Sequence, residues 1–196
     1  MARMKVPTIV LASASPRRAE LLRNAGIPFT VDVANIAEDV QPEESPTEHA
    51  ERLAREKAEV VAKRNSGNIV LGADTIVVVN DQILGKPRDA QDAARMLGLL
   101  SGRAHEVVTG VCLARVGLET RNPKLETSSS RTIVHFARLS ASDIEDYVAT
   151  HEPMDKAGAY AIQGIASRWI NKIEGDYANV VGLPVALVWK MLQKFS

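Results

Sequence analysis

The stretch of residues 68–88, NIVLGADTIVVVNDQILGKPR, holds the side chains best placed to do chemistry. One carboxylate, Asp74, stands between two β-branched runs, where burial costs free energy unless a cation pairs with it. Asn80 and Asp81 are typical turn residues, so the chain is predicted to return as the second arm of a hairpin. Lys86 follows that arm, and we therefore expect Asp74 and Lys86 to lie close together near the foot of the hairpin.

The alternative for this stretch is a charged loop residue beside a solvated lysine. Two observations favour a functional interpretation instead. Asp74 has apolar neighbours on both sides, and the residues directly before it, Gly72 and Ala73, are small. Small residues at such a position are expected to leave room for a ligand.

A second polar group, made of Ser13, Ser15, Arg17 and Arg18, lies where an expected strand at residues 8–12 passes into a helix. Ser15 is a typical helix N-cap, and the proline after it suits the first helical position. The backbone N–H groups and dipole at a helix N-terminus favour an anion, and arginine binds phosphate through two hydrogen bonds. An ordinary capped helix with two solvated arginines is the alternative. We favour a phosphate site, because cations in the first turn oppose the helix dipole.

Glu38 lies in an acidic loop that follows an expected strand at residues 29–33. An ordinary acidic loop is the simplest interpretation of this segment. The alternative is that Glu38 supplies a second carboxylate to a metal site beside a phosphate.

Residues 45–64 are predicted to form a helix that begins with a capping box. Arg52 and Glu56 are expected to pair on its exposed side. Lys57 lies beside the apolar stripe of this helix, four residues from an apolar position in either direction. Its ammonium group either extends to solvent or points into an anion-binding cleft, and the sequence leaves both interpretations open.

Residues 154–164 combine small side chains with single polar groups, a composition that suits backbone passing close to a ligand. Gln163 offers both a donor and an acceptor, as reading the edge of a base requires. The hydrophobic pattern of the rest of the chain predicts an α/β or α+β domain. Its remaining elements are helices that begin near Asp89, Ser140 and Pro184, and strands at 106–116, 131–137 and 168–174.

The composition argues against several classes of protein. Lys+Arg and Asp+Glu are 24 each among 196 residues, so nucleic acid held by bulk electrostatics is disfavoured. The single cysteine, Cys112, excludes an internal disulfide and favours a reducing, cytoplasmic location. No apolar run approaches the length of a membrane span, and the four histidines lack zinc-ligand spacing. Carboxylates among cations instead suggest a hard divalent metal between protein and phosphate.

Four motifs lie in this order at residues 11–18, 72–75, 85–87 and 155–164, and residues 181–184 form a further short motif near the end of the chain. Together they closely resemble the Maf family of nucleoside triphosphate pyrophosphatases, and the match spans nearly the whole chain. The resemblance is strongest to the branch that acts on dTTP and UTP. The branch that acts on 7-methyl-GTP typically has a tryptophan in place of Arg17, which this chain lacks.

The resemblance implies one domain over residues 1–196 with a mixed α/β, elongated two-lobed fold like that of inosine triphosphatase. It places a central mixed sheet in that fold and the nucleotide in a cleft between the lobes. It implies hydrolysis of dTTP and UTP to the monophosphate and pyrophosphate with Mg²⁺ or Mn²⁺, as house-cleaning of standard or modified nucleotides. It allows a homodimer and implies neither a nucleic-acid nor a membrane partner.

The resemblance also implies roles for individual residues. Asp74 matches the proton acceptor, and Glu38 with Asp74 would hold the metal. Lys57 and Lys86 match the family's catalytic lysines. Ala37 stands where relatives often have a second glutamate, which leaves less charge near the metal. The implied substrate-binding residues are Ser13, Ser15, Arg17, Arg18, Thr75 and Gln163, of which Arg17, Thr75 and Gln163 match positions that distinguish the pyrimidine branch.

Two other classes of function stay open at this point. One is a nucleotide sensor that binds without turnover and regulates cell division. The other is a nucleic-acid-binding protein, which the zero net charge disfavours.

Overall fold

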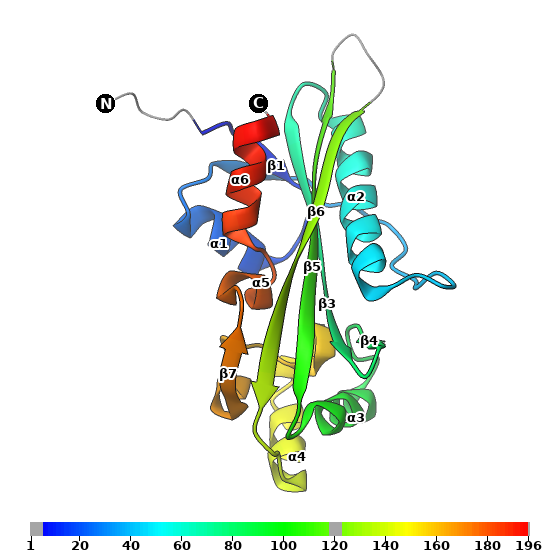
Figure 1. Cartoon of the computed structure of the whole chain (residues 1–196), viewed down its shortest axis with the longest axis vertical. Helices are drawn as coiled ribbons and strands as arrows, with labels where there is room; N and C mark the ends of the chain where they lie inside the picture. The colour runs from blue at the N-terminus through cyan, green and yellow to red at the C-terminus, as the bar shows by residue number, and fades with distance from the viewer. Residues whose placement is uncertain (1–5, 118–122, 196) are drawn as a thin grey trace. The chain divides into compact units, whose positions relative to one another are not determined.

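The computed structural model describes residues 6–117 and 123–195 (Figure 1). Within these residues one seven-stranded sheet has the order β2-β1-β3-β5-β6-β7, and β4 pairs with β3. β1 runs parallel to β2 and β3, whereas β4 is antiparallel to β3 and β7 to β6. The predicted mixed α/β class with a central mixed sheet is confirmed. The strands are β1 (Ile9–Leu11), β2 (Phe29–Val31), β3 (Ile69–Val79), β4 (Gln82–Leu84), β5 (Ala104–Val116), β6 (Pro123–Phe136) and β7 (Ile170–Glu174).

Most helices begin at the caps that the sequence predicts. Ser15, Ser45, Asp89 and Ser140 each accept a backbone N–H bond through their side chains, and Ser45 and Ser140 form full capping boxes. No helix among residues 6–117 and 123–195 is both long and apolar enough to span a membrane. The α-helices are α1 (Pro16–Asn24), α2 (Pro46–Arg64), α3 (Ala90–Leu100), α4 (Ala141–Ala149), α5 (Tyr177–Val181) and α6 (Val185–Phe195). The described residues also form the short 3-10 helices η1 (Glu152–Asp155), η2 (Ala157–Ala159) and η3 (Ile165–Trp169).

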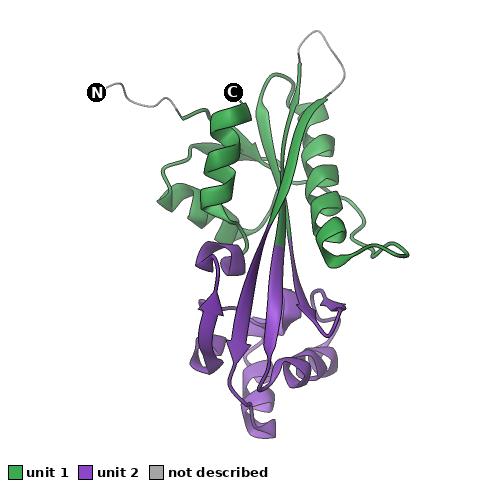
Figure 2. Ribbon diagram, viewed as in Figure 1, with its two compact units in different colours: residues 1–74, 109–129, 182–196 green, residues 75–108, 130–181 purple. Residues whose placement is uncertain are grey.

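The chain divides into two compact units (Figure 2). The first unit consists of residues 1–74, 109–129 and 182–196, and the second consists of residues 75–108 and 130–181. The long strands β3, β5 and β6 each contribute residues to both units. A single domain with two lobes remains a prediction.

The first unit has three layers, with α1 and α6 on one face of its sheet and α2 on the other (Figure 1). Strand residues alternate between the two cores because successive side chains of a strand point to opposite faces. Ile9 and Leu11 pack with α1 and α6, whereas Val10 and Ala12 pack with α2. Both faces are covered, so the strands of this unit are apolar along nearly their whole length.

Helix α2 lies exceptionally close to the sheet, because the strand residues beneath it are small. A Cβ atom added to Gly72 in β3 would lie 2.1 Å from the Ala54 carbonyl oxygen. One added to Gly110 in β5 would lie 2.2 Å from the Ala50 carbonyl oxygen. Cys112 is fully buried in the same core, as predicted, and burial raises the pKa of its thiol to about 11.

The second unit encloses one core between its part of the sheet, α3 and α4. The predicted hairpin is confirmed, with β3 and β4 joined at Asn80 and Asp81. Both turn residues have positive φ (49° and 60°), which matches the twist of the flanking strands. His105 and Tyr160 are buried in this unit, and the His105 Nε2 atom lies 2.8 Å from the Tyr160 hydroxyl.

Candidate active site

Lys57 links Asp74 and Glu38 in the first unit. Its Nζ atom lies 2.6 Å from Asp74 Oδ1 and 2.6 Å from Glu38 Oε1. The side chains of Lys57 and Asp74 are each 9% exposed, whereas that of Glu38 is 48% exposed. The Lys57 ammonium group therefore does not extend along the helix to solvent but lies between two carboxylates, one buried and one at the surface.

The alternation of β3 explains why Asp74 meets a residue of α2. Val70 packs in the core beneath α2, and Gly72 and Asp74 follow it on the same face at intervals of two residues. Since Gly72 lets the α2 backbone lie directly on the strand, Lys57 reaches Asp74 within hydrogen-bonding distance. The expectation that Gly72 leaves room for a ligand is therefore wrong, because the backbone of α2 at Ala54 and Ala58 fills that space.

Arg18 is buried, and its guanidinium group donates hydrogen bonds to acceptors of the protein itself. Nε donates to the Gly182 carbonyl oxygen at 2.9 Å, and Nη1 donates to Ser13 Oγ at 3.0 Å and the Ala73 carbonyl oxygen at 2.8 Å. Burial lowers the pKa of Arg18, and the charge of Asp74 opposes this shift. Arg18 is therefore not a solvated arginine, as the alternative interpretation had it, but joins α1 to β3 and to the residues before α6. Its role at a phosphate stays a prediction.

Ser13 and Ser15 shape the turn between β1 and α1. Ser13 Oγ accepts hydrogen bonds from the Ser15 backbone N–H at 3.2 Å and from Arg18. Ser15 Oγ accepts from the Arg18 backbone N–H at 3.5 Å as the N-cap. Both hydroxyls act as acceptors in these bonds, and a hydroxyl can also donate to a phosphate oxygen. Arg17, in the same turn, is half-buried.

The remaining predicted site residues, Thr75, Lys86 and Gln163, belong to the second unit. Thr75 is half-buried in β3, whereas Lys86 and Gln163 are exposed. The Gly158 backbone N–H donates to the Gly85 carbonyl oxygen at 3.0 Å, so the segments next to Lys86 and before Gln163 lie side by side. The expected proximity of Lys86 to Asp74 stays a prediction.

Glu152 and Tyr147 hold the turn that carries Gln163. The Glu152 carboxylate accepts the Ile165 backbone N–H at 3.0 Å and the Tyr147 hydroxyl at 2.9 Å. The Tyr147 hydroxyl in turn accepts the Ala161 backbone N–H at 3.3 Å. Both ends of the turn are therefore fixed to one carboxylate, while the Gln163 side chain is exposed.

Among residues 6–117 and 123–195, no three His, Cys, Asp or Glu side chains form a group that could hold a metal ion. Glu38 and Asp74 converge on one ammonium group and supply two carboxylates. Mg²⁺ is usually bound by one or two carboxylates together with phosphate oxygens and water, so these residues fit a metal that arrives with a phosphate. They do not make an all-protein metal cage.

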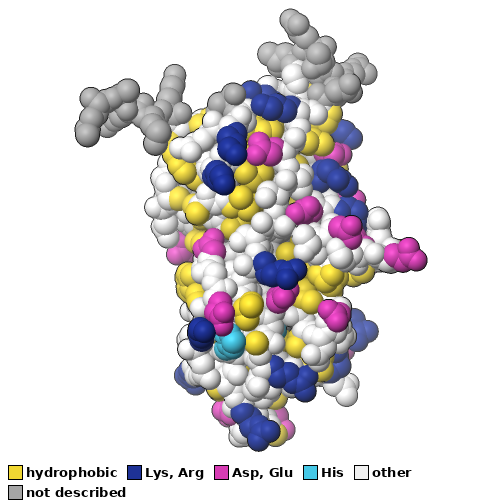
Figure 3. All heavy atoms as spheres, viewed as in Figure 1, with side chains coloured by type: hydrophobic (Ala, Val, Ile, Leu, Met, Phe, Trp, Pro, Cys, Tyr) yellow, Lys and Arg dark blue, Asp and Glu magenta, His cyan; other side chains and the backbone are white. Residues whose placement is uncertain are grey.

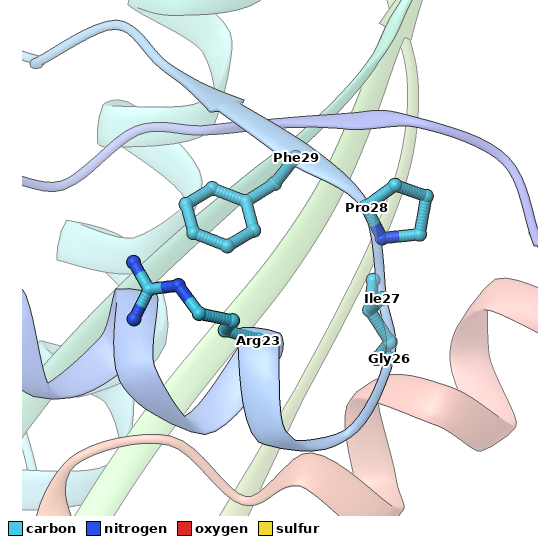
Figure 4. Close-up of a pocket in the computed structure, with 5 residues that line it drawn as sticks. All are labelled: Arg23, Gly26, Ile27, Pro28 and Phe29. Atoms are coloured by element: carbon cyan, nitrogen blue, oxygen red, sulfur yellow. The ribbon is translucent and has the colours of Figure 1, made fainter.

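A shallow hollow elsewhere in the first unit is separate from these residues. Arg23, Gly26, Ile27, Pro28 and Phe29 line it (Figure 4). It lies where α1 ends and β2 begins, at the opposite end of α1 from Ser15. It adds no carboxylate to the cluster at Lys57.

Charged side chains of both signs are interspersed on the face of the molecule drawn in Figure 3. This distribution agrees with the net charge of zero. A surface that binds nucleic acid by electrostatics would instead gather lysine and arginine into one patch.

One pair of residues beside the site, Arg52 and Glu44, was not predicted from the sequence. Arg52 was expected only to pair with Glu56, and that contact is present at 3.2 Å. Its shorter contacts are with Glu44, at 2.6 Å from Nε and 2.9 Å from Nη2. Glu44 precedes the helix cap and fits no periodic pattern, so the sequence held no signal for this pair.

Comparisons with known proteins identify the family of this chain. The family model described as Maf-like protein matches residues 8–195. A dTTP/UTP pyrophosphatase of Koribacter versatilis (strain Ellin345) is 52% identical over 186 residues, covering 95% of this chain and 93% of that protein. A dTTP/UTP pyrophosphatase of Bacillus cereus (strain AH820) is 46% identical over 188 residues, covering 96% and 95%.

Among solved structures, that of the Ham1 protein of Staphylococcus aureus aligns with a TM-score of 0.47 and 15% identity. The alignment covers 96% of this chain and 100% of that chain, and the likeness is too weak to bear on function. The family match and the curated relatives extend over nearly the whole chain. The resemblance that the motifs indicate is thereby confirmed, and the chain belongs to the Maf family.

Proposed function

We propose that this chain is a nucleoside triphosphate pyrophosphatase that hydrolyses dTTP and UTP to the monophosphate and pyrophosphate. Relatives about half identical to it over nearly their full length bear the name dTTP/UTP pyrophosphatase. The observation that carries the proposal is the cluster of Glu38, Lys57 and Asp74, in which a buried lysine joins two carboxylates. Such a cluster suits the hydrolysis of a phosphoanhydride, since it combines a proton acceptor with a positive charge that can stabilise the phosphate oxygens.

In the proposed reaction a water oxygen attacks the α-phosphorus, and the bond from that phosphorus to the bridging oxygen breaks. Asp74 orients the water and accepts its proton, while the bridging electron pair leaves with pyrophosphate. Lys57, Lys86 and Arg18 stabilise the negative charge that develops on the phosphates. Ser13 and Ser15 donate to phosphate oxygens at the N-terminus of α1.

Glu38 and Asp74 would hold a divalent cation, Mg²⁺ or Mn²⁺. When bound, this cation supplies positive charge that polarises the phosphate and offsets its repulsion of the attacking oxygen. The two carboxylates fit this role because they already meet at one cation, the Lys57 ammonium group.

Base selectivity is assigned to Arg17, Thr75 and Gln163. Thymine and uracil present an acceptor, a donor and an acceptor along one edge, and the Gln163 amide can answer part of that pattern. Cytosine exchanges two of these features, and each buried group left unpaired costs about 1–3 kcal/mol. We therefore expect dTTP and UTP to be better substrates than CTP, and GTP to be poor.

The experiment is a screen of standard and modified nucleoside triphosphates for pyrophosphate release with Mg²⁺ or Mn²⁺, on wild type and Gln163→Ala. The proposal predicts release from dTTP and UTP, and a smaller UTP to CTP ratio of specificity constants in the variant. A wild-type preference for 7-methyl-GTP would contradict the pyrimidine assignment. An unchanged UTP to CTP ratio in Gln163→Ala would remove Gln163 from base reading.

A nucleotide sensor that regulates cell division is the second candidate. The same screen separates the two, because a sensor would bind nucleotides without releasing pyrophosphate. The cluster at Lys57 favours the enzyme, since binding alone does not require a buried carboxylate beside the phosphate site.

A further inference from the structure

The loop between β2 and α2 carries Glu38, and its side chains are largely exposed. Residues 37–43 are all exposed, and the Glu38 side chain pairs with the buried Lys57 of α2. A carboxylate on such a loop needs a fixed backbone if it is to stay near a buried partner. The anchors of this loop therefore bear directly on where Glu38 lies.

Arg52 of α2 supplies those anchors. Its Nη2 atom donates to the Asp39 carbonyl oxygen at 2.9 Å, directly after Glu38. The same side chain holds Glu44 through a two-pronged contact, from Nε at 2.6 Å and from Nη2 at 2.9 Å. One guanidinium group thus fixes both the start and the end of the segment of residues 39–44.

Glu44 extends the attachment. Its Oε2 atom accepts the Gln41 backbone N–H at 3.2 Å and lies 3.0 Å from His49 Nδ1. The side chains of Arg52 and Glu44 are only 11% and 8% exposed, although the loop around Glu44 is exposed. The hydrogen bond from Arg52 lowers the pKa of Glu44 to about 2, so the pair keeps both charges across the physiological range.

We propose that Arg52 and Glu44 are positioning residues that hold the loop so that Glu38 meets Lys57 and Asp74 on the metal side of the phosphate. This inference rests on the proposed function, since it assigns the loop to metal binding. Neither residue touches the reacting atoms. An ordinary surface salt bridge would contribute little, but this pair is buried, and Arg52 also donates to the Asp39 carbonyl oxygen next to Glu38.

Four proteins test the proposal: wild type, Arg52→Ala, the uncharged double variant Arg52→Met/Glu44→Gln, and Arg55→Ala as the matched control. Arg55 is on the same helix, is half-exposed, and its nearest carboxylate contact is Glu59 at 4.0 Å. The double variant avoids leaving Glu44 as a buried charge without its partner. It therefore separates loss of positioning from loss of stability.

The first measurement uses no nucleotide and no metal. Hydrogen–deuterium exchange of residues 38–44, including the Gln41 amide, should speed up in both Arg52 variants and stay at the wild-type rate in Arg55→Ala. The second measurement is Mn²⁺ binding by calorimetry in the presence of a non-hydrolysable dTTP analogue, because the two carboxylates fit a metal that arrives with a phosphate. The third is the Mg²⁺ dependence of pyrophosphate release from dTTP. Residues that orient metal ligands typically change metal affinity by about 10–100-fold, and we expect a loss of that size in both assays.

Restored thermal stability in the double variant, together with weakened Mn²⁺ binding, would support positioning. Wild-type Mn²⁺ affinity in the double variant would overturn the proposal, as would unchanged exchange of the loop amides. If wild type released no pyrophosphate, the proposed function would fail, while exchange and Mn²⁺ binding would still decide whether Arg52 positions Glu38.

Discussion

Replacing Lys57 with methionine removes the ammonium group that contacts both Asp74 and Glu38. Methionine keeps an unbranched apolar stem and a helix propensity close to that of lysine, so packing and helix formation change little. Asp74 would then be a carboxylate that is 9% exposed and without its ammonium partner.

The expected loss follows from this burial. Removing one partner of a buried ion pair typically destabilises a protein by about 3–5 kcal/mol, because the other charge stays buried. Glu38 is 48% exposed and can regain water, so we expect the lower end of this range, about 3 kcal/mol. For a chain of this length, such a loss lowers the melting temperature by roughly 6–12 °C.

The assay is thermal and urea unfolding at neutral pH of Lys57→Met, Lys57→Met/Asp74→Asn and Lys63→Met. Lys63 is an exposed lysine in the last turn of the same helix, so Lys63→Met controls for losing a positive charge there. Asparagine in the double variant removes the unpaired charge, and we expect it to restore more than half of the lost stability. Pyrophosphate release should fall in both Lys57 variants.

Two results would refute this reasoning. If Lys57→Met melted within a degree or two of Lys63→Met, the contact with Asp74 would not stabilise the fold. If the double variant were as unstable as Lys57→Met, the loss would come from packing rather than from an unpaired carboxylate.

Three further predictions follow from the same geometry. Asp74→Asn should lower pyrophosphate release by about 10²–10⁴-fold with only a small change in melting temperature, because asparagine still offers Lys57 an acceptor. Asp81→Asn in the exposed turn is the control, and retention of more than roughly a tenth of the activity in Asp74→Asn would contradict the role of Asp74. Arg18→Ala should raise KM for dTTP and UTP alike, and it should lower the free energy of unfolding by about 1–3 kcal/mol for each carbonyl that loses its donor, at Ala73 and Gly182. Arg23→Ala at the other end of α1 is the control, and a rise in KM confined to one base would argue against a phosphate role for Arg18. Gly72→Ala should lower the free energy of unfolding by about 1–3 kcal/mol, and it should reduce turnover because it moves α2, and Lys57 on it, away from β3. Gly98→Ala, where a Cβ meets nothing within 4 Å, should have neither effect, and equal melting curves for the two variants would count against the close packing of α2.

Local chemistry predicted much of the fold. Ser15, Ser45, Asp89 and Ser140 mark helix starts because a side-chain oxygen satisfies a backbone N–H there, whatever the tertiary structure. Asn80 and Asp81 predicted the hairpin because both residues tolerate positive φ. These signals depend on neighbours in sequence, so they can be read without the fold.

Element lengths were harder to predict, because pairing decides them. The segment around Asp74 reads as an interruption between two apolar runs, yet β3 continues from Ile69 to Val79. Its neighbours in the sheet hold the backbone extended through this position, and Lys57 compensates the buried charge. Strand β6 likewise begins at Pro123, eight residues before the alternating pattern at Arg131, and the short helix α5 was not predicted.

Predictions about the site divide in the same way. Residue types identified Asp74, Lys57 and Glu38 as unusual, but only the fold shows that one ammonium group contacts both carboxylates. The role of Gly72 was misjudged, because a small residue in a sequence gives no indication of whether a ligand or a helix fills the space beside it. The pair of Arg52 and Glu44 depends on a loop contact that has no periodicity to reveal it.

The central claim is that water attacks the α-phosphorus of a pyrimidine nucleoside triphosphate. Hydrolysis of dTTP with Mg²⁺ in ¹⁸O-labelled water, followed by mass spectrometry of the products, tests it directly. We predict dTMP carrying one ¹⁸O atom and unlabelled pyrophosphate from wild type, and about 10²–10⁴-fold slower formation of the same products by Asp74→Asn. Label in pyrophosphate, products dTDP and phosphate, or no turnover by wild type would contradict the account.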